Sequence, residues 1–171
     1  MDVFEAIMSR ESIRRYSDEQ VPRTLLLRLL EAARWAPSTG NCQPWRFVVV
    51  SERTSVRLIR DFSPGFAFEA PVLIVICWEK DTKSPGVARE HLRSANCYLA
   101  AQNICLAACE VGLGTCMIGS FSPAAVAEIL SLPDDVYPEL IMALGYPQQQ
   151  PSKRSRLPLT ELVHFECWSD A

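Results

Sequence analysis

The sequence is poor in the residues on which hydrolytic and metal-dependent chemistry most often depend. It has two histidines, His91 and His164, no C-x-x-C pair and no G-x-S-x-G motif. Nucleophilic catalysis needs a base beside the nucleophile, and a zinc site needs several nitrogen or sulfur ligands at close spacing. The sequence therefore favours neither acyl transfer nor a metal centre, and we expect no metal.

Long apolar runs and an excess of positive charge are also missing. No stretch reaches the roughly 18 apolar residues of a membrane span, and the first residues do not form a signal-peptide pattern. The net charge is −3 and the pI about 5.4, so no global basic field exists for nucleic acid or an acidic membrane. With 171 residues, 49% of them hydrophobic, we expect one soluble cytoplasmic domain with neither of those partners.

Seven cysteines form an odd set in mostly apolar surroundings: Cys42, Cys77, Cys97, Cys105, Cys109, Cys116 and Cys167. Cys105 and Cys109 lie four residues apart, so a helix would place both on one face. Because only two histidines are present to complete a metal site, we interpret the cysteines as reduced and mostly buried thiols.

Helical patterns recur along the chain. Asp2 and Glu5 form a capping box ahead of a short helix, and a leucine-rich stripe after Pro22 predicts a second helix that Pro37 ends. The longest helical pattern runs over about 87–111 and ends at glycines. A further helix is predicted from Ser122-Pro123 to about residue 130, where serine caps and proline suits the first turn.

Strand patterns lie between these helices. They cover 47–50, 71–78, 115–118 and 139–144. The stretch 71–78 is so uniformly apolar that both of its faces should be covered, which predicts a place in the middle of a sheet. Mixed helices and strands in one domain indicate an α+β fold.

Near the start, Arg10, Ser12 and Arg14 occupy alternate positions, where an extended chain points all three side chains one way. Two guanidinium groups and a hydroxyl could hold a phosphate by charge-assisted hydrogen bonds. A solvated, charged loop between two helices is the alternative.

A polar loop follows at 37–45, between a helical pattern and a β-branched run. Its hydroxyl and amide groups could meet a polyol or a heteroaromatic edge, and Gly40 allows close approach of the backbone. An ordinary turn before a strand, with Trp45 as a core anchor, explains the same residues.

Five motifs in a fixed order connect these segments: R-x-S-x-R at 10–14, A-P-S-x-x-N-x-Q-P-W at 36–45, G-L-G-T-x-x-I-G at 112–119, L-G-Y-P at 144–147 and K-R-S-R-L-P at 153–158. Each motif is short, but together they span nearly the whole chain. In this order they resemble the flavin-dependent nitroreductase superfamily.

The resemblance implies a nitroreductase-like α+β fold, with a central, mainly antiparallel sheet flanked by helices, and a homodimer with an exchanged C-terminal arm. Residues 1–147 would form the FMN-binding domain. Residues 148–171 would belong to the same domain, complete the flavin site and embrace the second subunit. The apolar residues near the end of the chain favour a partner surface, although folding back on their own domain is the alternative. They are Leu162, Val163, Phe165 and Trp168.

The resemblance also implies FMN-binding residues at the subunit interface. Arg10, Ser12 and Arg14 match the segment where one subunit binds the phosphate and the pyrimidine side of the flavin. Arg154 and Arg156 match the late basic pair that closes on the phosphate.

Two further segments match the positions that contact the flavin ring. The loop that the other subunit contributes to the ribityl chain and ring matches Pro37, Ser38, Thr39 and Asn41. The strand end whose backbone lies against the isoalloxazine, where an amide can hydrogen-bond the reactive ring nitrogen, matches Met117, Ile118 and Gly119.

The activity that the resemblance implies is an NAD(P)H-dependent flavin oxidoreductase. NADH or NADPH delivers hydride to FMN and leaves, and then an organic acceptor such as a nitroaromatic, quinone or flavin is reduced in the same space. No side chain need be catalytic, because the cofactor supplies the chemistry. Arg14, near the pyrimidine carbonyl, would stabilise the anionic reduced flavin.

Departures from the family pattern bear on the substrate. Only twenty residues separate Val50 from Pro71, so the helical insertions that often cover the flavin are short or missing, and Asn96 stands where the family commonly has an acidic residue. Three phenylalanines could wall the flavin or lie in the core: Phe62, Phe66 and Phe68. Alternatives are a reductive dehalogenase or flavin-modifying member, a non-catalytic flavin or nucleotide carrier or regulatory dimer, and an interaction domain.

Overall fold

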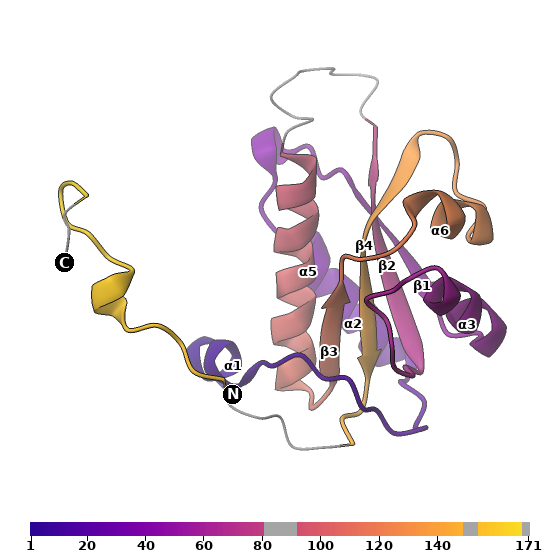
Figure 1. Ribbon diagram of the computed structural model, residues 1–171, viewed down its shortest axis with the longest axis horizontal. Helices are drawn as coiled ribbons and strands as arrows, with labels where there is room; N and C mark the ends of the chain where they lie inside the picture. The colour runs from indigo at the N-terminus through magenta and orange to yellow at the C-terminus, as the bar shows by residue number, and fades with distance from the viewer. Residues whose placement is uncertain (81–91, 149–153, 169–171) are drawn as a thin grey trace.

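The computed structural model describes residues 1–80, 92–148 and 154–168 and is built around a four-stranded sheet (Figure 1). The strands follow the order β1-β2-β4-β3, and every neighbouring pair is antiparallel. Their bounds are β1 (Trp45–Val50), β2 (Val72–Glu79), β3 (Gly114–Ile118) and β4 (Val136–Gly145). The predicted α+β fold with an antiparallel sheet is thus confirmed.

Helices cover both faces of the sheet. On one face α2 (Arg23–Arg34) and α5 (Arg93–Glu110) pack against apolar side chains that include Ile74 and Ile76 of β2. On the other face α3 (Arg53–Asp61) and α6 (Pro123–Ile129) pack against the alternate side chains of the same strand, Leu73 and Val75. Since β2 lies between β1 and β4 and is buried on both faces, its predicted central position is confirmed.

Local chemistry explains where the helices begin. α1 (Val3–Ser9) starts with the predicted capping box, in which Asp2 accepts from the Glu5 amide and Glu5 accepts from the Asp2 amide. Ser122 caps α6 by accepting from an amide of its first turn, as predicted. The longest helical pattern appears as α5, which begins at Arg93; positions 87–91 of that prediction lie outside the described residues.

One helix, α3, was not predicted; it is short, and four of its nine residues are charged. Its only buried residues are Val56 and Ile59, one helical turn apart. Glu52 caps it by accepting from the amides of Thr54 and Ser55, and these hydrogen bonds lower the pKa of that carboxyl to about 2. The segment between Val50 and Pro71 thus contains one helix of nine residues, which packs on the sheet, and the expectation that flavin-covering insertions are short or missing stays a prediction.

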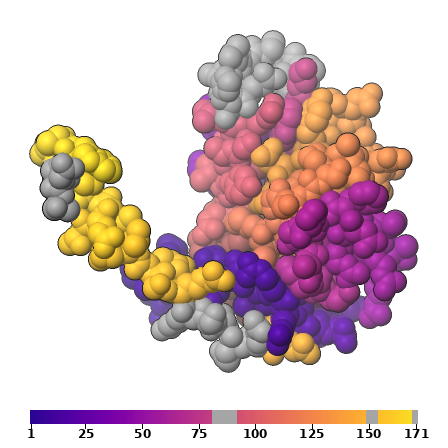
Figure 2. Space-filling view, in the orientation of Figure 1, coloured from indigo at the N-terminus to yellow at the C-terminus, as the bar shows by residue number. Residues whose placement is uncertain are grey.

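Beyond β4 the chain returns to the N-terminal segment and then leaves the core. The Ser17 amide donates to the Tyr146 carbonyl at 2.9 Å, and the Gln148 amide donates to the Arg15 carbonyl at 2.9 Å. Residues 154–168, which include the 3-10 turn η2 (Leu159–Glu161), extend past α1 and away from the sheet (Figures 1 and 2). Apolar side chains on this arm are largely exposed, with Phe165 at 83% and Trp168 at 82%.

The cysteines are free thiols and most of them are buried, in agreement with the sequence interpretation. All seven cysteines are free, and four are buried: Cys77, Cys97, Cys105 and Cys116. Among the described residues no group of histidines, cysteines and carboxylates has the arrangement of a metal site. None of the helices in the described ranges is long and apolar enough to cross a membrane.

Candidate functional site

Five of the sequence-predicted residues meet around one small cavity. Its volume is about 120 Å³. The cavity is lined by Arg10, Glu11, Ser12, Arg14, Arg154 and Arg156. Residues more than 140 positions apart in the chain are therefore neighbours in space, and together they surround a polar hollow with guanidinium groups.

The first half of the cavity is positioned by backbone pairing with β3. Ser12 forms a parallel β-bridge with Thr115, and the Ile13 amide donates to the Thr115 carbonyl at 2.8 Å. Ile13 points into the core and is 4% exposed, whereas Ser12 and Arg14 point outward and are exposed. The alternation that the sequence predicted for this segment is thus present, and the core side chain fixes which way the arginines face.

A glycine allows this close pairing. A Cβ atom at Gly114 would lie 2.6 Å from Cγ1 and 2.8 Å from Cβ of Ile13. Real side chains do not approach so closely, so a larger residue at 114 would push the arginine segment away from the sheet.

The second half of the cavity comes from the start of the C-terminal arm. The pairing of residues 146–148 with 15–17 directs the chain back towards the N-terminal segment. The Arg156 guanidinium donates through Nη1 to the carbonyls of Arg154 at 3.3 Å and Ser155 at 3.1 Å. These bonds use one nitrogen of the side chain and leave donors for a ligand.

The charges around the cavity favour an anion. Four cationic guanidinium groups line the cavity together with one carboxylate, that of Glu11. Such a set suits a phosphate dianion, because each guanidinium can give a charge-assisted hydrogen bond. Glu11 was not singled out from the sequence, although its place between Arg10 and Ser12 in an extended segment marks it as a neighbour of the site.

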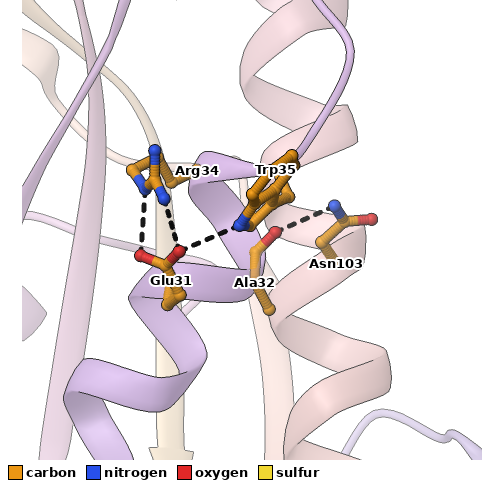
Figure 3. Close-up of polar contacts among 5 residues, drawn as sticks. All are labelled: Glu31, Ala32, Arg34, Trp35 and Asn103. Carbon is orange, nitrogen blue, oxygen red and sulfur yellow. Dashed lines mark hydrogen bonds and ion pairs between the residues drawn. The ribbon is translucent and has the colours of Figure 1, made fainter.

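The polar loop lies at a different place, after the C-terminal end of α2. Figure 3 shows how this end is fixed: Glu31 accepts from both Arg34 and Trp35, and the Asn103 side chain donates to the Ala32 carbonyl at 3.0 Å. The 3-10 turn η1 (Thr39–Asn41) follows. The Thr39 amide donates to Oδ1 of Asn96 at 3.2 Å, which joins the loop to α5.

The loop and the arginine cavity lie at opposite ends of α5. Thr39 contacts the first turn of that helix at Asn96, whereas Ser9, beside Arg10, contacts its last turn through Cys109, with Oγ and Sγ 3.3 Å apart. At a rise of about 1.5 Å per residue, these two contacts are roughly 20 Å apart along the helix axis. The structure therefore brings the five cavity residues together within the chain but does not bring Pro37, Ser38, Thr39 and Asn41 to them.

The third predicted segment is the end of β3. Met117 is partly buried and Ile118 is buried, while Gly119 follows the strand and is exposed. A Cβ atom at Gly119 would lie 3.6 Å from the hydroxyl of Tyr98, an exposed residue of α5. This strand is also the one that positions Ser12, so a ligand along β3 could reach from the arginine cavity to the exposed strand end.

The three phenylalanines after α3 divide between core and surface. Phe66 is 1% exposed and packs edge-to-face on Phe68, with ring centroids 4.9 Å apart. Phe62 is 48% exposed. Of the phenylalanines that could wall the flavin, Phe66 therefore lies in the core, whereas Phe62 is accessible to a ligand or a partner.

Comparison with known proteins gives consistent matches over most of the chain. Residues 7–64 and 58–146 match the family model described as "Nitroreductase family". An NADH dehydrogenase of Thermus thermophilus is 33% identical, with 95% of each chain covered. An FMN reductase [NAD(P)H] of Bacillus subtilis is 27% identical over 98% of this chain and 74% of its own. The crystal structure of a nitroreductase family protein from Clostridium difficile superposes with a TM-score of 0.87 at 29% identity, covering 98% of this chain and 100% of that one.

Proposed function

The chain belongs to the nitroreductase family, and on this basis we propose that it is an NAD(P)H-dependent oxidoreductase with FMN as its cofactor. The similar Bacillus subtilis protein is named an FMN reductase that uses NAD(P)H. The acceptor is a small organic molecule of the nitroaromatic, quinone or flavin class. A cytoplasmic location stays a prediction.

The observation that carries the proposal is the convergence of four arginines and a serine on one cavity. The residues fit the phosphate of FMN, because a dianion there meets permanent positive charge and several hydrogen-bond donors. Arg10, Ser12 and Arg14 meet the phosphate and the pyrimidine side of the flavin from the N-terminal segment, while Arg154 and Arg156 close on the phosphate from the arm.

The protein contributes orientation and charge, and the bound FMN supplies hydride acceptance and its transfer onward. Arg14 lies on the same extended segment as Ser12 and adds a fixed cation that favours negative charge on the ligand. The backbone at Met117, Ile118 and Gly119 presents amide groups to the ring. In this mechanism no side chain need serve as nucleophile or general base.

A second copy of the chain completes the site. The polar loop of Pro37, Ser38, Thr39 and Asn41 lies roughly 20 Å along α5 from the arginine cavity of its own chain. We propose that it serves the cavity of a partner, as the family resemblance implies. We propose that the C-terminal arm, which the structure describes over residues 154–168, crosses to that partner. The exposed apolar side chains of the arm, Phe165 and Trp168 among them, support this arrangement, because such a surface is stable only when covered.

The phosphate assignment is tested by comparing FMN with riboflavin, which differs only in lacking the phosphate. We expect FMN to bind more tightly, and Arg10→Ala or Arg156→Ala to weaken FMN binding by the roughly 1.5–3 kcal/mol of a charged hydrogen bond. Riboflavin affinity should stay the same in both variants. Equal affinities of the wild type for the two flavins, measured by fluorescence quenching, would overturn the assignment.

The proposed enzymatic activity is tested by measuring turnover. Oxidation of NADH or NADPH should depend on added FMN and on an acceptor such as menadione or a nitroaromatic. A protein that binds FMN but never oxidises either nucleotide would instead be a flavin carrier.

A further inference from the structure

Asn96 is a buried polar residue in the first turn of α5. It is 2% exposed, and its side chain is directed at the polar loop rather than at its own helix. Oδ1 accepts from the Thr39 amide at 3.2 Å and lies 3.5 Å from the Thr39 hydroxyl, and Nδ2 donates to Sγ of Cys42 at 3.8 Å. One side chain thus contacts the loop at two of its residues.

The loop that Asn96 contacts has an unfavourable backbone conformation. Gly40, Asn41 and Gln43 all have positive φ, at 57°, 56° and 46°. For the two residues with side chains this left-handed conformation costs energy, and it persists only where surrounding contacts enforce it. A loop of this kind needs an external anchor if it is to keep one conformation before a ligand arrives.

Contacts inside the loop supply part of that support. The Gln43 amide donates to Oγ of Ser38 at 3.0 Å, and the Cys42 amide donates to the Thr39 carbonyl at 3.2 Å. These bonds close the turn on itself but do not fix its place on the protein. The Asn96 contacts do so, because α5 is packed against the sheet and α2.

We propose that Asn96 is the positioning residue of the flavin-binding loop: it holds Ser38, Thr39 and Asn41 in the conformation that receives the ribityl chain and ring of FMN. This inference rests on the proposed function. Oδ1 of Asn96 accepts from the Thr39 amide and from its hydroxyl, which leaves the lone pairs of that hydroxyl for a ligand. The Ser38 oxygen accepts from the Gln43 amide, so its O–H remains to donate, and Asn41 keeps its side chain for the ligand. Asn96 itself does not touch the cofactor.

Substitution of Asn96 should lower the fraction of molecules in which the loop has its flavin-binding conformation. Without the acceptor at position 96 the loop visits other conformations, and the apparent affinity falls in proportion to the fraction that stays competent. Asn96→Leu keeps the branched heavy-atom skeleton but has neither acceptor nor donor, and we expect it to weaken FMN and riboflavin binding alike by about tenfold, since the buried hydrogen bonds to the loop are lost. The ratio of the two affinities should not change, because the phosphate cavity is intact.

Two further variants separate an effect of Asn96 on flavin affinity from an effect on protein stability. Asn96→Asp keeps an oxygen facing the Thr39 amide and should restore flavin affinity to within about twofold of wild type. Ile104→Val shortens a fully buried side chain on the same helix and should lower the melting temperature of the flavin-free protein without changing affinity. All variants are compared as full-length protein, by fluorescence quenching with both flavins and by thermal unfolding without flavin.

The outcomes distinguish this inference from the proposed function. If Arg156→Ala weakens FMN binding but Asn96→Leu does not, the positioning role is wrong and the flavin site stands. If Asn96→Leu loses only stability, or if Asn96→Asp fails to rescue it, the residue is structural. If the wild type binds neither flavin, the proposed function fails, and the role of Asn96 fails with it.

Discussion

Ser12 and Thr115 are bridged partners, although more than 100 residues separate them in the chain. The bridge is parallel, and the neighbouring Ile13 amide donates to the Thr115 carbonyl at 2.8 Å. The arginines on either side of Ser12 are therefore held by a backbone pairing to β3, and not by a helix or a flexible turn. This pairing sets the geometry of the arginine cavity and gives the first prediction.

Gly114→Ala should displace the arginine segment. The new methyl group would meet Ile13 at 2.6–2.9 Å, so either the strand or the segment must move. We expect a loss of stability of about 1–3 kcal/mol, as for other overpacked sites, together with weaker FMN binding. Thermal unfolding and fluorescence quenching measure the two effects.

A second glycine provides the control for that variant. Gly112 has φ of 77° but open space around its Cβ position. Gly112→Ala should therefore destabilise the protein by backbone strain while leaving FMN affinity unchanged. Equal FMN affinities in Gly114→Ala and wild type would contradict the link between the bridge and the cavity.

Glu11→Gln should tighten FMN binding. Its carboxylate lines the same cavity as the four arginines and repels a phosphate dianion. Removing one partly screened charge should improve affinity by roughly twofold to fivefold, with a larger gain at low salt. Glu128→Gln, an exposed change on α6, serves as the control. Weaker binding in Glu11→Gln would mean that the carboxylate organises the arginines instead of opposing the ligand.

Shortening the aromatic side chains of the arm should weaken the dimer. Phe165 and Trp168 are more than four-fifths exposed in the single chain, so a partner that covers them gains apolar contact area. In Phe165→Ser/Trp168→Ser we expect dissociation to monomers at micromolar concentration, measured by light scattering after size exclusion. Leu58→Ser, an exposed position on α3, should leave the dimer intact. A wild type that is monomeric at all concentrations would contradict the shared site.

Stability should fall at alkaline pH because of the buried thiols. Burial raises the pKa of Cys97 from 9.0 to about 12, with the nearby Glu139 and Cys77 adding to the effect. The folded chain favours the neutral thiol. The contribution of Cys97 to the free energy of unfolding is therefore fully present below pH 9 and is lost as the pH rises towards 12. One such thiol costs about 1 kcal/mol of stability between pH 9 and 10.

Urea unfolding at several pH values measures that loss. The decline from pH 8 to 10 should be smaller in Cys97→Ala than in wild type. Ile104→Val removes a methyl group from the same helix without removing a titrating group, so it should lower stability by the same amount at every pH. Parallel profiles for Cys97→Ala and wild type would contradict the role of the thiol.

The predictable parts of the fold are those with local causes. The capping box at Asp2 and Glu5, the Ser122 cap and the apolar run of β2 each act over a few residues, and all three appear as the sequence indicates. By contrast, α3 is amphipathic but only nine residues long, and just two of its residues, Val56 and Ile59, are buried. The other sequence feature that could have indicated α3 is its N-cap residue, Glu52.

The candidate site was partly predictable for a different reason. The residue types and order of the motifs point to Arg10, Arg14, Arg154 and Arg156, but their meeting in one cavity depends on chain pairings far apart in sequence. Nothing in local sequence indicates that Asn96 reaches the polar loop. That contact follows from how α5 packs beside α2, which only the three-dimensional structure reveals.

The most direct test of the central claim is the visible absorption spectrum of the protein with FMN, recorded under anaerobic conditions before and after addition of NADH or NADPH. We predict a protein-bound flavin band that bleaches with either nucleotide and returns when an acceptor is added. A bound flavin that neither nucleotide bleaches would contradict the proposed oxidoreductase activity, and absence of FMN binding would contradict the site itself.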